Sequence, residues 1–249
     1  MALDMASTPM DLSIVIPALD ERENLTRLIP ALQELARSMH IAAQIVVVDG
    51  PSRDGTAEAA TSLGAAVVKQ REPGYGGALM AGFAAARAPF VITMDADLSH
   101  PAAFVRDLWA RRNDAEILIA SRYVGGGAAT VGLVRRILSV ILNSVYRLAL
   151  SLPVRDLSSG FRLYRRDALL GLHLESRDFD VLEEILVLGY NQGWRILEIP
   201  FHYMPRASGV SHAKLIQFGR AYLRTLVKMR RLRNTSVPNS GLVGRRTKA

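Results

Sequence analysis

Cysteine is absent from this chain of 249 residues. Its absence excludes disulfide bridges, catalysis by a thiolate and zinc sites built on cysteine, and it fits a reducing compartment. The first 30 residues also lack a basic stretch followed by an apolar one, and they contain Asp4, Asp11 and Asp20. This is not the pattern of a secretory signal, so we expect a cytoplasmic protein.

Acidic residues are missing from the C-terminal part of the chain. After Glu198 the sequence has no Asp or Glu, although it holds 11 of the 31 lysines and arginines there. The first 198 residues, with 20 basic and 23 acidic side chains, carry a net charge of −3, whereas the whole chain carries +8. A basic segment of this kind indicates an anionic partner, either a membrane surface or a nucleic acid.

Long uninterrupted apolar runs are also lacking. Residues 131–152 have the apolar spacing of a helix, but Arg135, Arg136 and Arg147 interrupt it. A membrane-spanning helix needs about 20 predominantly apolar residues. We therefore expect that this helix packs on the domain or lies at a membrane interface.

Residues 213–233 show the pattern of a basic amphipathic helix. Its basic side chains recur every three or four residues, at Arg220, Arg224, Lys228 and Arg231. We expect this helix to lie at a membrane surface. Residues 234–249 are polar and basic with Gly, Pro and Ser, so they are predicted to be a disordered basic tail.

The remaining chain has the composition of a folded protein, with 49% hydrophobic and 22% charged residues. Short apolar strands alternate with amphipathic helices. The predicted strands are 12–16, 45–48, 65–68, 90–94 and 117–120, and the predicted helices are 21–39, one from near 54, 75–87, 101–112 and 181–191. This alternation predicts an α/β fold with a mostly parallel, Rossmann-like sheet covered by helices.

The stretch FVITMDADLSHP, residues 90–101, is the strongest candidate for a site. Its apolar run predicts a buried strand, and Asp95 and Asp97 follow where the carboxyl end of that strand lies. Residues two apart in an extended chain point the same way, so both carboxylates can meet one hard cation such as Mg²⁺ or Mn²⁺. A second Asp-x-Asp at Asp178 and Asp180 lacks a preceding strand and is expected by chance.

A set of motifs in fixed order resembles the family 2 glycosyltransferases. The motifs are SIVIPALDERENL, VVVDGPSRDGT, MDADLSHP, SRY, RRILS, DLSSGFRLYRRDAL and PRASG, and the similarity runs from about Leu12 to Lys214. Within that family the order is most similar to the dolichol-phosphate (polyprenol-phosphate) mannose synthases. Each motif alone is weak evidence, and the ordered set makes the resemblance specific.

The resemblance implies a GT-A fold over residues 12–212, between an N-terminal tail of residues 1–11 and the basic helix 213–233. It also implies a metal-dependent, inverting transfer of mannose from GDP-mannose to a polyprenyl (dolichyl) phosphate. Relatives that carry transmembrane helices have them after the catalytic domain. We therefore expect a peripheral protein on the cytoplasmic face of a membrane, bound through its amphipathic helices or through a separate membrane-anchor subunit.

The motifs imply a nucleotide-sugar site and a metal site. Pro17, Glu21, Asp49 and Asp95, with Arg206, would border the nucleotide sugar, whereas Asp95, Asp97 and Ser99 would hold Mg²⁺ or Mn²⁺. Two roles fit Ser99, because it either supplies a further ligand or caps the helix that starts near Pro101. Glu21 either contacts the nucleotide or places a favourable charge in the first turn of a helix.

One departure from the family pattern concerns the base of the donor. Asp49 is followed by Gly50, where relatives often carry a second acid, so the base preference stays open. The nearby Asp54 fits a helix cap better than a ligand.

Three residues match family positions that contact the acceptor phosphate, namely Arg122, Arg135 and Ser139. A guanidinium group suits this role because it can donate two hydrogen bonds to phosphate oxygens. Arg135 is alternatively part of a solvated helix face. Arg206 matches an arginine near the transferring phosphates. Beyond it, either His212 or Lys214 takes the place of a lysine found in relatives.

The segment Asp156, Ser159, Gly160, Phe161 and Arg162 matches a family motif near the donor sugar and the acceptor. The implied catalytic residues are Asp97, Arg206 and Asp156. A phosphate monoester is already largely anionic at pH 7, so it can attack without a strong general base. Asp156 is therefore expected to orient an arginine or a sugar hydroxyl, or less readily to act as a base.

The glycine-rich stretch 72–77, EPGYGG, precedes a predicted helix and is either a phosphate cradle or a plain tight turn. It does not match G-x-G-x-x-G. The first strand is followed by Pro-Ala-Leu-Asp-Glu instead of a glycine fingerprint, which argues against a dinucleotide-binding dehydrogenase.

Two alternatives to mannosyl transfer are kept. The enzyme could use another nucleotide sugar, such as UDP-glucose, or another acceptor. A more distant alternative is a non-catalytic protein whose basic C-terminal segment binds nucleic acid. That segment contains few aromatic residues, Phe218 and Tyr222 among them, without the interleaved pattern that base stacking needs, so no nucleic-acid partner is expected.

Overall fold

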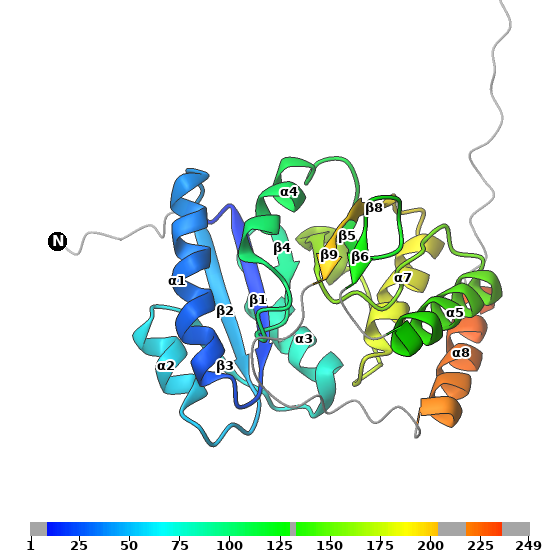
Figure 1. The fold of residues 1–249 in the computed structure, drawn as a ribbon, viewed down its shortest axis with the longest axis horizontal. Coiled ribbons are helices and arrows are strands. Elements are labelled where there is room, and N and C mark those ends of the chain that lie inside the picture. Colours follow the sequence, from blue (N-terminus) through cyan, green and yellow to red (C-terminus); the bar gives the residue numbers. More distant parts are fainter. Residues whose placement is uncertain (1–8, 130–132, 204–217, 236–249) are drawn as a thin grey trace, which may run out of the picture.

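A computed structural model describes residues 9–129, 133–203 and 218–235 of the protein. Its centre is a seven-stranded sheet with helices on both faces (Figure 1). Across the sheet the strands run in the order β3 (Ala66–Lys69), β2 (Ala43–Asp49), β1 (Leu12–Ala18), β4 (Phe90–Thr93), β7 (Arg162–Arg165), β5 (Ile117–Ser121) and β8 (Ile196–Pro200). A second, two-stranded sheet pairs β6 (Ala128–Ala129) with β9 (His202–Tyr203).

The helices alternate with these strands along most of the chain. They are α1 (Arg22–Ser38), α2 (Thr56–Ser62), α3 (Gly74–Ala85), the 3₁₀ helix η1 (Ala102–Phe104), α4 (Val105–Ala110), α5 (Leu133–Leu150), α6 (Arg166–Leu170), α7 (Val181–Asn191) and α8 (Phe218–Thr235). The predicted α/β fold is therefore confirmed.

All strand pairs of the large sheet are parallel except those of β7, which runs antiparallel to both β4 and β5. The sheet is thus mostly parallel, as predicted. Alternating residues on each strand face two separate cores, as period-2 geometry requires. On β1, Ile14 packs in the core under α1, whereas Val15 packs in the core that contains Leu79 and Phe83 of α3.

Two predicted helices differ from the observed ones. The helix predicted over residues 101–112 is split into η1 and α4, and α4 ends at Ala110. The helix predicted over residues 213–233 is described from Phe218 on as α8, which continues to Thr235, two residues into the tail predicted to be disordered. The first residues of that prediction, and the tail 234–249 beyond Thr235, lie outside the described residues.

Helices α5, α7 and α8 lie side by side at one end of the molecule (Figure 1). Met229 of α8 is fully buried, and Arg233 of α8 donates hydrogen bonds to the Leu150 carbonyl of α5 and to Asn191 Oδ1 of α7. Large apolar side chains nevertheless stay exposed on α5 and α8, at Val140, Ile141, Val145, Leu148, Leu223 and Val227. None of the described helices is both long and apolar enough to cross a membrane.

Candidate active site

Several predicted site residues meet at one edge of the sheet, where parallel strands end. Asp49 is the last residue of β2 and pairs with Ala18, the last residue of β1. Asp95 lies two residues after Thr93, the last residue of β4. Thr93 pairs with Val15 of β1, and Pro17 lies two residues after Val15. The fold therefore brings Pro17, Asp49 and Asp95 to one edge of the sheet. Pro17 and Asp49 lie within β1 and β2 rather than after them, because both strands continue further than predicted.

The carboxylate of Asp49 can accept a hydrogen bond from a ligand. The residue is buried, and its Oδ1 atom has no hydrogen-bond partner among the described residues. A buried acceptor without a partner is costly, so a ligand that donates an N–H or O–H group here would be favoured. At the next position, a Cβ atom on Gly50 would lie 3.3 Å from the Ala18 carbonyl oxygen, so the second acid of relatives would need a small shift of the backbone.

Glu21 lies at the N-terminal end of α1 and supports the start of that helix. Its Oε2 atom accepts a hydrogen bond from Asn24 Nδ2 at 2.5 Å, and its backbone N–H donates to Thr56 Oγ1 at 2.9 Å. Glu21 precedes α1 and its side chain makes no capping hydrogen bond, so the acid predicted in the first turn of this helix is Glu23 instead. A contact with the nucleotide stays a prediction.

Asp54 acts at helix starts, as predicted. It accepts hydrogen bonds from the backbone N–H groups of Arg22, the first residue of α1, and Thr56, the first residue of α2. Partial burial raises the pKa of Asp54, but hydrogen bonds from Thr56 and Arg22 outweigh it and lower the pKa below its ordinary value.

Asp97 and Ser99 form a compact turn behind Asp95. Both are buried, and Asp97 Oδ1 accepts hydrogen bonds from the Ser99 backbone N–H at 3.0 Å and from the Ser99 hydroxyl at 2.5 Å. Leu98 between them has a φ of 61°, which is unusual for a bulky residue. Such strained positions concentrate at functional sites, and here the turn fixes the carboxylate of Asp97.

The capping role proposed for Ser99 is wrong. The residue preceding η1 is Pro101, and no side-chain hydrogen bond caps this helix. The Ser99 hydroxyl is directed to Asp97 instead, because the left-handed backbone at Leu98 turns it back toward the carboxylate. Its metal-ligand role stays a prediction.

Asp95 is the more accessible acid of the pair, with its side chain 35% exposed. Its Oδ1 atom accepts a hydrogen bond of 3.4 Å from the hydroxyl of Tyr75. Burial raises the pKa of Tyr75 well above its ordinary value, and the charge of Asp95 adds to this, so the hydroxyl keeps its proton and donates.

His100 supports the turn from behind, and the sequence analysis did not single it out. Its Nδ1 atom accepts a hydrogen bond from the Asp95 backbone N–H at 3.0 Å, and its ring stacks on Phe161 at 4.8 Å. Burial lowers the pKa of His100 despite the opposing effect of Asp95, so the ring is neutral near pH 7. The charges of Arg122 and Asp156 also act on this ring, which places both halves of the site near it.

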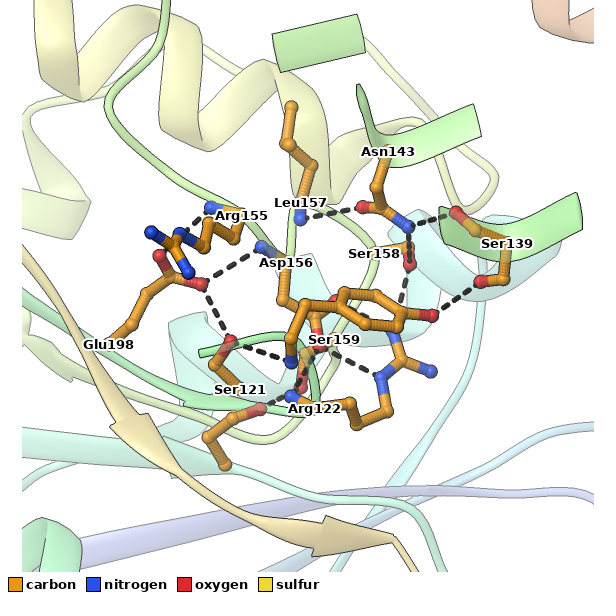
Figure 2. Close-up of polar contacts among 12 residues, drawn as sticks. Ser121, Arg122, Ser139, Asn143, Arg155, Asp156, Leu157, Ser158, Ser159 and Glu198 are labelled. Atoms are coloured by element: carbon orange, nitrogen blue, oxygen red, sulfur yellow. Dashed lines mark hydrogen bonds and ion pairs between the residues drawn. The ribbon is translucent and has the colours of Figure 1, made fainter. Parts of the chain in front are cut away.

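The second half of the site is an ion pair between Arg122 and Asp156 (Figure 2). Arg122 Nε and Nη2 donate to the two carboxylate oxygens of Asp156 at 2.8 and 2.6 Å, and the Arg122 backbone N–H also donates, at 2.9 Å. Asp156 is fully buried, whereas the Arg122 side chain is 18% exposed. Burial disfavours the charge on Arg122, but Asp156 outweighs it and raises the pKa of the guanidinium.

Helix α5 joins this ion pair through two polar side chains. The Ser139 hydroxyl lies 2.6 Å from the Tyr123 hydroxyl. Asn143 donates to the Ser139 carbonyl at 2.9 Å and accepts from the Leu157 backbone N–H at 2.9 Å (Figure 2). The Ser158 hydroxyl accepts hydrogen bonds from Arg122 Nη2 at 2.9 Å and from Asn143 Nδ2 at 3.4 Å. Arg122 and Ser139, both predicted to bind the acceptor phosphate, therefore belong to one hydrogen-bonded network.

Two further predicted phosphate ligands are not placed by the structure. Arg135 lies in α5, but its side chain is not among those described. Arg206, like His212 and Lys214, lies outside the described residues.

Glu198 on β8 anchors the network, and sequence reasoning missed it. Its Oε1 atom accepts hydrogen bonds from the Ser121 hydroxyl at 2.7 Å and the Asp156 backbone N–H at 2.9 Å. Its Oε2 atom accepts from the Arg155 backbone N–H at 2.8 Å (Figure 2). Only one signal in the sequence pointed to this residue, namely that it is the last acid in the chain.

The glycine-rich stretch 72–77 packs against protein rather than forming an open cradle. Cβ atoms added to Gly74 and Gly76 would lie within 2.5 Å of the backbone carbonyl oxygens of Arg177 and Ser176, respectively. The N–H of Gly77 donates to the Arg177 carbonyl at 3.1 Å. Gly74 to Gly77 form the first turn of α3, so the tight turn expected before this helix is wrong, because the helix already begins within the glycine-rich stretch.

A comparison with known families decides the classification. The sequence model described as "Glycosyl transferase family 2" matches residues 13–171, which contain the described site residues from Pro17 to Asp156 but not Glu198. The chain is a family 2 glycosyltransferase.

Relatives of this family 2 glycosyltransferase include the "Dolichol-phosphate mannosyltransferase" of Pyrococcus furiosus, which is 34% identical over 82% of the chain. The match covers 60% of that protein, so the chain spans less than two thirds of its length. The "Polyprenol monophosphomannose synthase" of Mycolicibacterium smegmatis is 32% identical over 80% of the chain and 79% of its own length.

Solved structures place the glycosyltransferase in the GT-A fold. A glucosyl-3-phosphoglycerate synthase from Mycobacterium tuberculosis matches 93% of the chain and 82% of its own, with a TM-score of 0.71 and 21% identity. It was crystallised with Mn²⁺, UDP and glucosyl-3-phosphoglycerate. At this level of identity the similarity establishes the shared fold.

The donor atoms of the glycosyltransferase suit a divalent metal that is shared with a substrate. Among the described residues no group of three or more His, Asp or Glu side chains could hold a metal by itself. Mg²⁺ in proteins usually takes one or two carboxylates and completes its shell with substrate phosphates and water. The partly exposed carboxylate of Asp95, together with the oriented carboxylate of Asp97, fits that requirement.

Proposed function

We propose that this family 2 glycosyltransferase transfers mannose from GDP-mannose to a polyprenyl phosphate, with inversion, and so forms polyprenyl-phosphate mannose. The observation that carries the proposal is the forked guanidinium of Arg122, which the buried carboxylate of Asp156 holds in a fixed orientation. Within the described residues its Nη1 atom has no hydrogen-bond partner, so it can donate to an acceptor phosphate. The names of the two mannosyl-transferring relatives also support this choice.

The donor would bind at the ends of β1, β2 and β4. Pro17, Glu21 and Asp49 would border the nucleotide, and the unpaired Oδ1 atom of Asp49 would accept a hydrogen bond from the base or ribose. Asp95 and Asp97, with Ser99, would hold Mg²⁺ or Mn²⁺, which neutralises charge on the leaving diphosphate. Arg206 is proposed to contact the transferring phosphates.

The reaction needs positioning more than proton transfer. An oxygen of the acceptor phosphate forms a bond to the anomeric carbon of mannose while the bond from that carbon to the diphosphate breaks, and GDP leaves. Because the attacking oxygen is already anionic at pH 7, no strong base is required. The oxygens of Asp156 are occupied by Arg122, so Asp156 contributes by orienting the guanidinium that holds the acceptor.

The acceptor is a lipid, and the proposal includes peripheral binding at the cytoplasmic face of a membrane. Ser139 and Asn143 connect the phosphate site to α5, whose exposed side includes Ile141, Val145 and Leu148. These three residues follow i, i+4 and i+7 spacing, so they share one face of the helix. Because an α-helix completes a turn in about 3.6 residues, this face lies opposite Ser139 and Asn143, so α5 would contact the phosphate site on one side and the membrane surface on the other.

A donor panel tests the proposal. Purified full-length protein with Mn²⁺ and polyprenyl phosphate is given radiolabelled GDP-mannose, GDP-glucose, UDP-glucose or UDP-galactose in turn. Label is expected in the lipid fraction with GDP-mannose only. A lipid product formed with UDP-glucose instead would replace the proposed donor, and no lipid product with any donor would refute the proposed acceptor class.

Asp97→Asn provides the matched variant for this assay. It retains the shape of the side chain but removes the charge that a divalent metal needs, so product formation is expected to fall at least about 100-fold. Asp107→Asn, on α4, removes an acid outside the proposed site and should leave the rate unchanged.

A further inference from the structure

The second Asp-x-Asp segment, residues 178–180, lies against the glycine-rich first turn of α3. The ring of Phe179 stacks on the ring of Tyr75, with 4.6 Å between centroids and 13° between planes. Phe179 is 67% exposed, which is unusual for a large apolar side chain. The hydroxyl end of Tyr75, in turn, reaches Asp95, the accessible acid of the proposed metal site.

The absence of a side chain at Gly160 leaves the space that the Tyr75 hydroxyl occupies. A Cβ atom added to Gly160 would lie 2.5 Å from the Tyr75 hydroxyl oxygen and 3.7 Å from Asp95 Oδ1. A side chain at position 160 would therefore displace the hydroxyl from the carboxylate. The DLSSGFR motif therefore needs glycine at position 160, because a side chain there would collide with the Tyr75 hydroxyl.

The segment that carries Phe179 is fixed from two sides. On one side the Arg177 carbonyl accepts a hydrogen bond from the Gly77 N–H at 3.1 Å. On the other side Lys228 of α8 donates to the Ser176 hydroxyl at 2.8 Å and lies 3.7 Å from an Asp180 carboxylate oxygen. Phe179 is therefore held at a defined place beside Tyr75, although its ring is largely exposed.

We propose that Tyr75, held by its stack on Phe179, is a positioning residue that orients the carboxylate of Asp95 for the divalent cation. The proposal rests on the metal site of the proposed function. A partly exposed carboxylate such as that of Asp95 can adopt more than one rotamer, and a hydrogen bond from a rigid neighbour restricts it. Groups that orient metal ligands in this way typically change metal affinity by about 10- to 100-fold when they are removed.

Direct binding of Mn²⁺ to the full-length protein tests the proposal. Free Mn²⁺ is measured by electron paramagnetic resonance during titration, with and without GDP. Tyr75→Phe keeps the stack but removes the hydroxyl, and it is expected to raise the Mn²⁺ dissociation constant about tenfold. Phe179→Ala is expected to raise it by a similar factor, whereas Phe179→Trp, which keeps a stacking ring, should restore it.

Tyr190→Phe is the matched control, because it removes a tyrosine hydroxyl from α7 outside the proposed site. Its Mn²⁺ affinity should equal that of the wild type. Turnover gives a second readout: in Tyr75→Phe, saturating Mn²⁺ should restore most of kcat, because the defect lies in metal affinity. A general loss of folding would lower kcat at every Mn²⁺ concentration and would also lower the melting temperature.

Gly160→Ala links the two observations in one experiment. Alone, it should weaken Mn²⁺ binding, because its Cβ atom meets the Tyr75 hydroxyl oxygen. Combined with Tyr75→Phe it should cause little further loss, because the colliding atom is gone and the ring carbon Cζ is 3.5 Å away. Independent, multiplying effects of the two substitutions would contradict the proposal.

The outcomes separate this inference from the proposed function. If wild type and Tyr75→Phe bind Mn²⁺ equally well, the positioning role is refuted while the metal site stands. A change in acceptor KM for Phe179→Ala without a change in Mn²⁺ affinity would also refute it. If the wild type binds no Mn²⁺ even with GDP, the metal site of the proposed function fails, and the inference fails with it.

Discussion

The carboxylate of Asp156 is fully buried and accepts three hydrogen bonds from Arg122. Removal of one partner of a buried ion pair leaves the other charge uncompensated. Asp156→Ala is therefore expected to lower the free energy of unfolding by about 3–5 kcal/mol, measured by urea denaturation.

The exposed pair of Arg37 and Glu34 on α1 is the matched control for this prediction. Glu34→Ala should change the free energy of unfolding by less than about 1 kcal/mol, because exposed ion pairs contribute little. Equal and small effects of the two substitutions would show that Asp156 does not hold Arg122 as described.

Glu183 on α7 is a second buried acid, and burial raises its pKa from 4.5 to about 7 against the attraction of Arg162. Between these two pH values the folded state binds more protons than the unfolded state, so the free energy of unfolding falls as pH rises. The wild type is expected to lose on the order of 3 kcal/mol across this window from Glu183. Glutamine is neutral at pH 5 and at pH 8. The free energy of unfolding of Glu183→Gln is therefore expected to exceed that of the wild type by more at pH 8 than at pH 5.

Urea denaturation of both proteins at pH 5 and pH 8 checks this prediction. The comparison between pH values removes any constant effect of the amide group. A margin that is the same at pH 5 and pH 8 would mean that Glu183 ionises in the folded protein as it does in the unfolded one.

At the level of single residues, the sequence predicted groups that follow a strand but not the groups that hold them. Asp49, Asp95 and Asp97 were found because an apolar run precedes each of them. Glu198 supports Asp156 from 42 residues away, and Tyr75 reaches Asp95 from 20 residues away. These contacts depend on how the sheet is assembled, and no local pattern records them.

Helix α5 connects the proposed phosphate site with an exposed apolar face. Ile141 and Leu148 are 54% and 70% exposed. Transfer of such a side chain from water into a lipid interface contributes about 1.5–3 kcal/mol. Ile141→Glu and Leu148→Glu are therefore expected to weaken binding to anionic vesicles by at least about tenfold each, in a sedimentation assay.

Leu170→Glu, on α6, is the matched control, because Leu170 is also half exposed but lies outside α5 and α8. It should leave vesicle binding unchanged. Turnover of a short, water-soluble prenyl phosphate should stay the same in all three variants. Unchanged vesicle binding by Leu148→Glu would exclude this face of α5 as the membrane contact.

Among the elements, helices with a clear apolar period were predicted closely. The prediction of residues 181–191 matches α7, and that of residues 21–39 differs from α1 by one residue at each end. The antiparallel direction of β7 was not predicted, because it depends on how the long excursion through α5 returns to the sheet. The break between η1 and α4 was missed as well, since the residues of both fit a helical pattern.

For the whole molecule, the sheet edge brings an acidic half and a basic half of the site together. Asp95 and Asp97 would hold the cation that binds the donor diphosphate, and Arg122 would hold the acceptor phosphate. His100 accepts a hydrogen bond from the Asp95 backbone in the acidic half, and the charges of Arg122 and Asp156 in the other half also affect its pKa. Two anions must approach each other in this reaction, so a cation on one side and a fixed guanidinium on the other are what the chemistry requires.

The basic C-terminal part of the chain fits this arrangement. Helix α8 packs beside α5 through Arg233, and its exposed apolar residues Leu223 and Val227 lie among basic side chains. Basic and apolar groups on neighbouring helices favour a surface of anionic lipid. On the proposed function, the acceptor lipid would be taken from the membrane that these helices contact.

The most direct test of the central claim compares two acceptors that differ only in the phosphate. Full-length protein with GDP-mannose and Mn²⁺ is given a polyprenyl phosphate or the polyprenol of the same chain length, and mannosyl lipid is quantified for the wild type and for Arg122→Lys. We predict product from the phosphate only, with kcat/KM reduced at least about 100-fold in Arg122→Lys, because lysine cannot form the forked contact. No product from the phosphate, or equal product from the alcohol, would contradict the account.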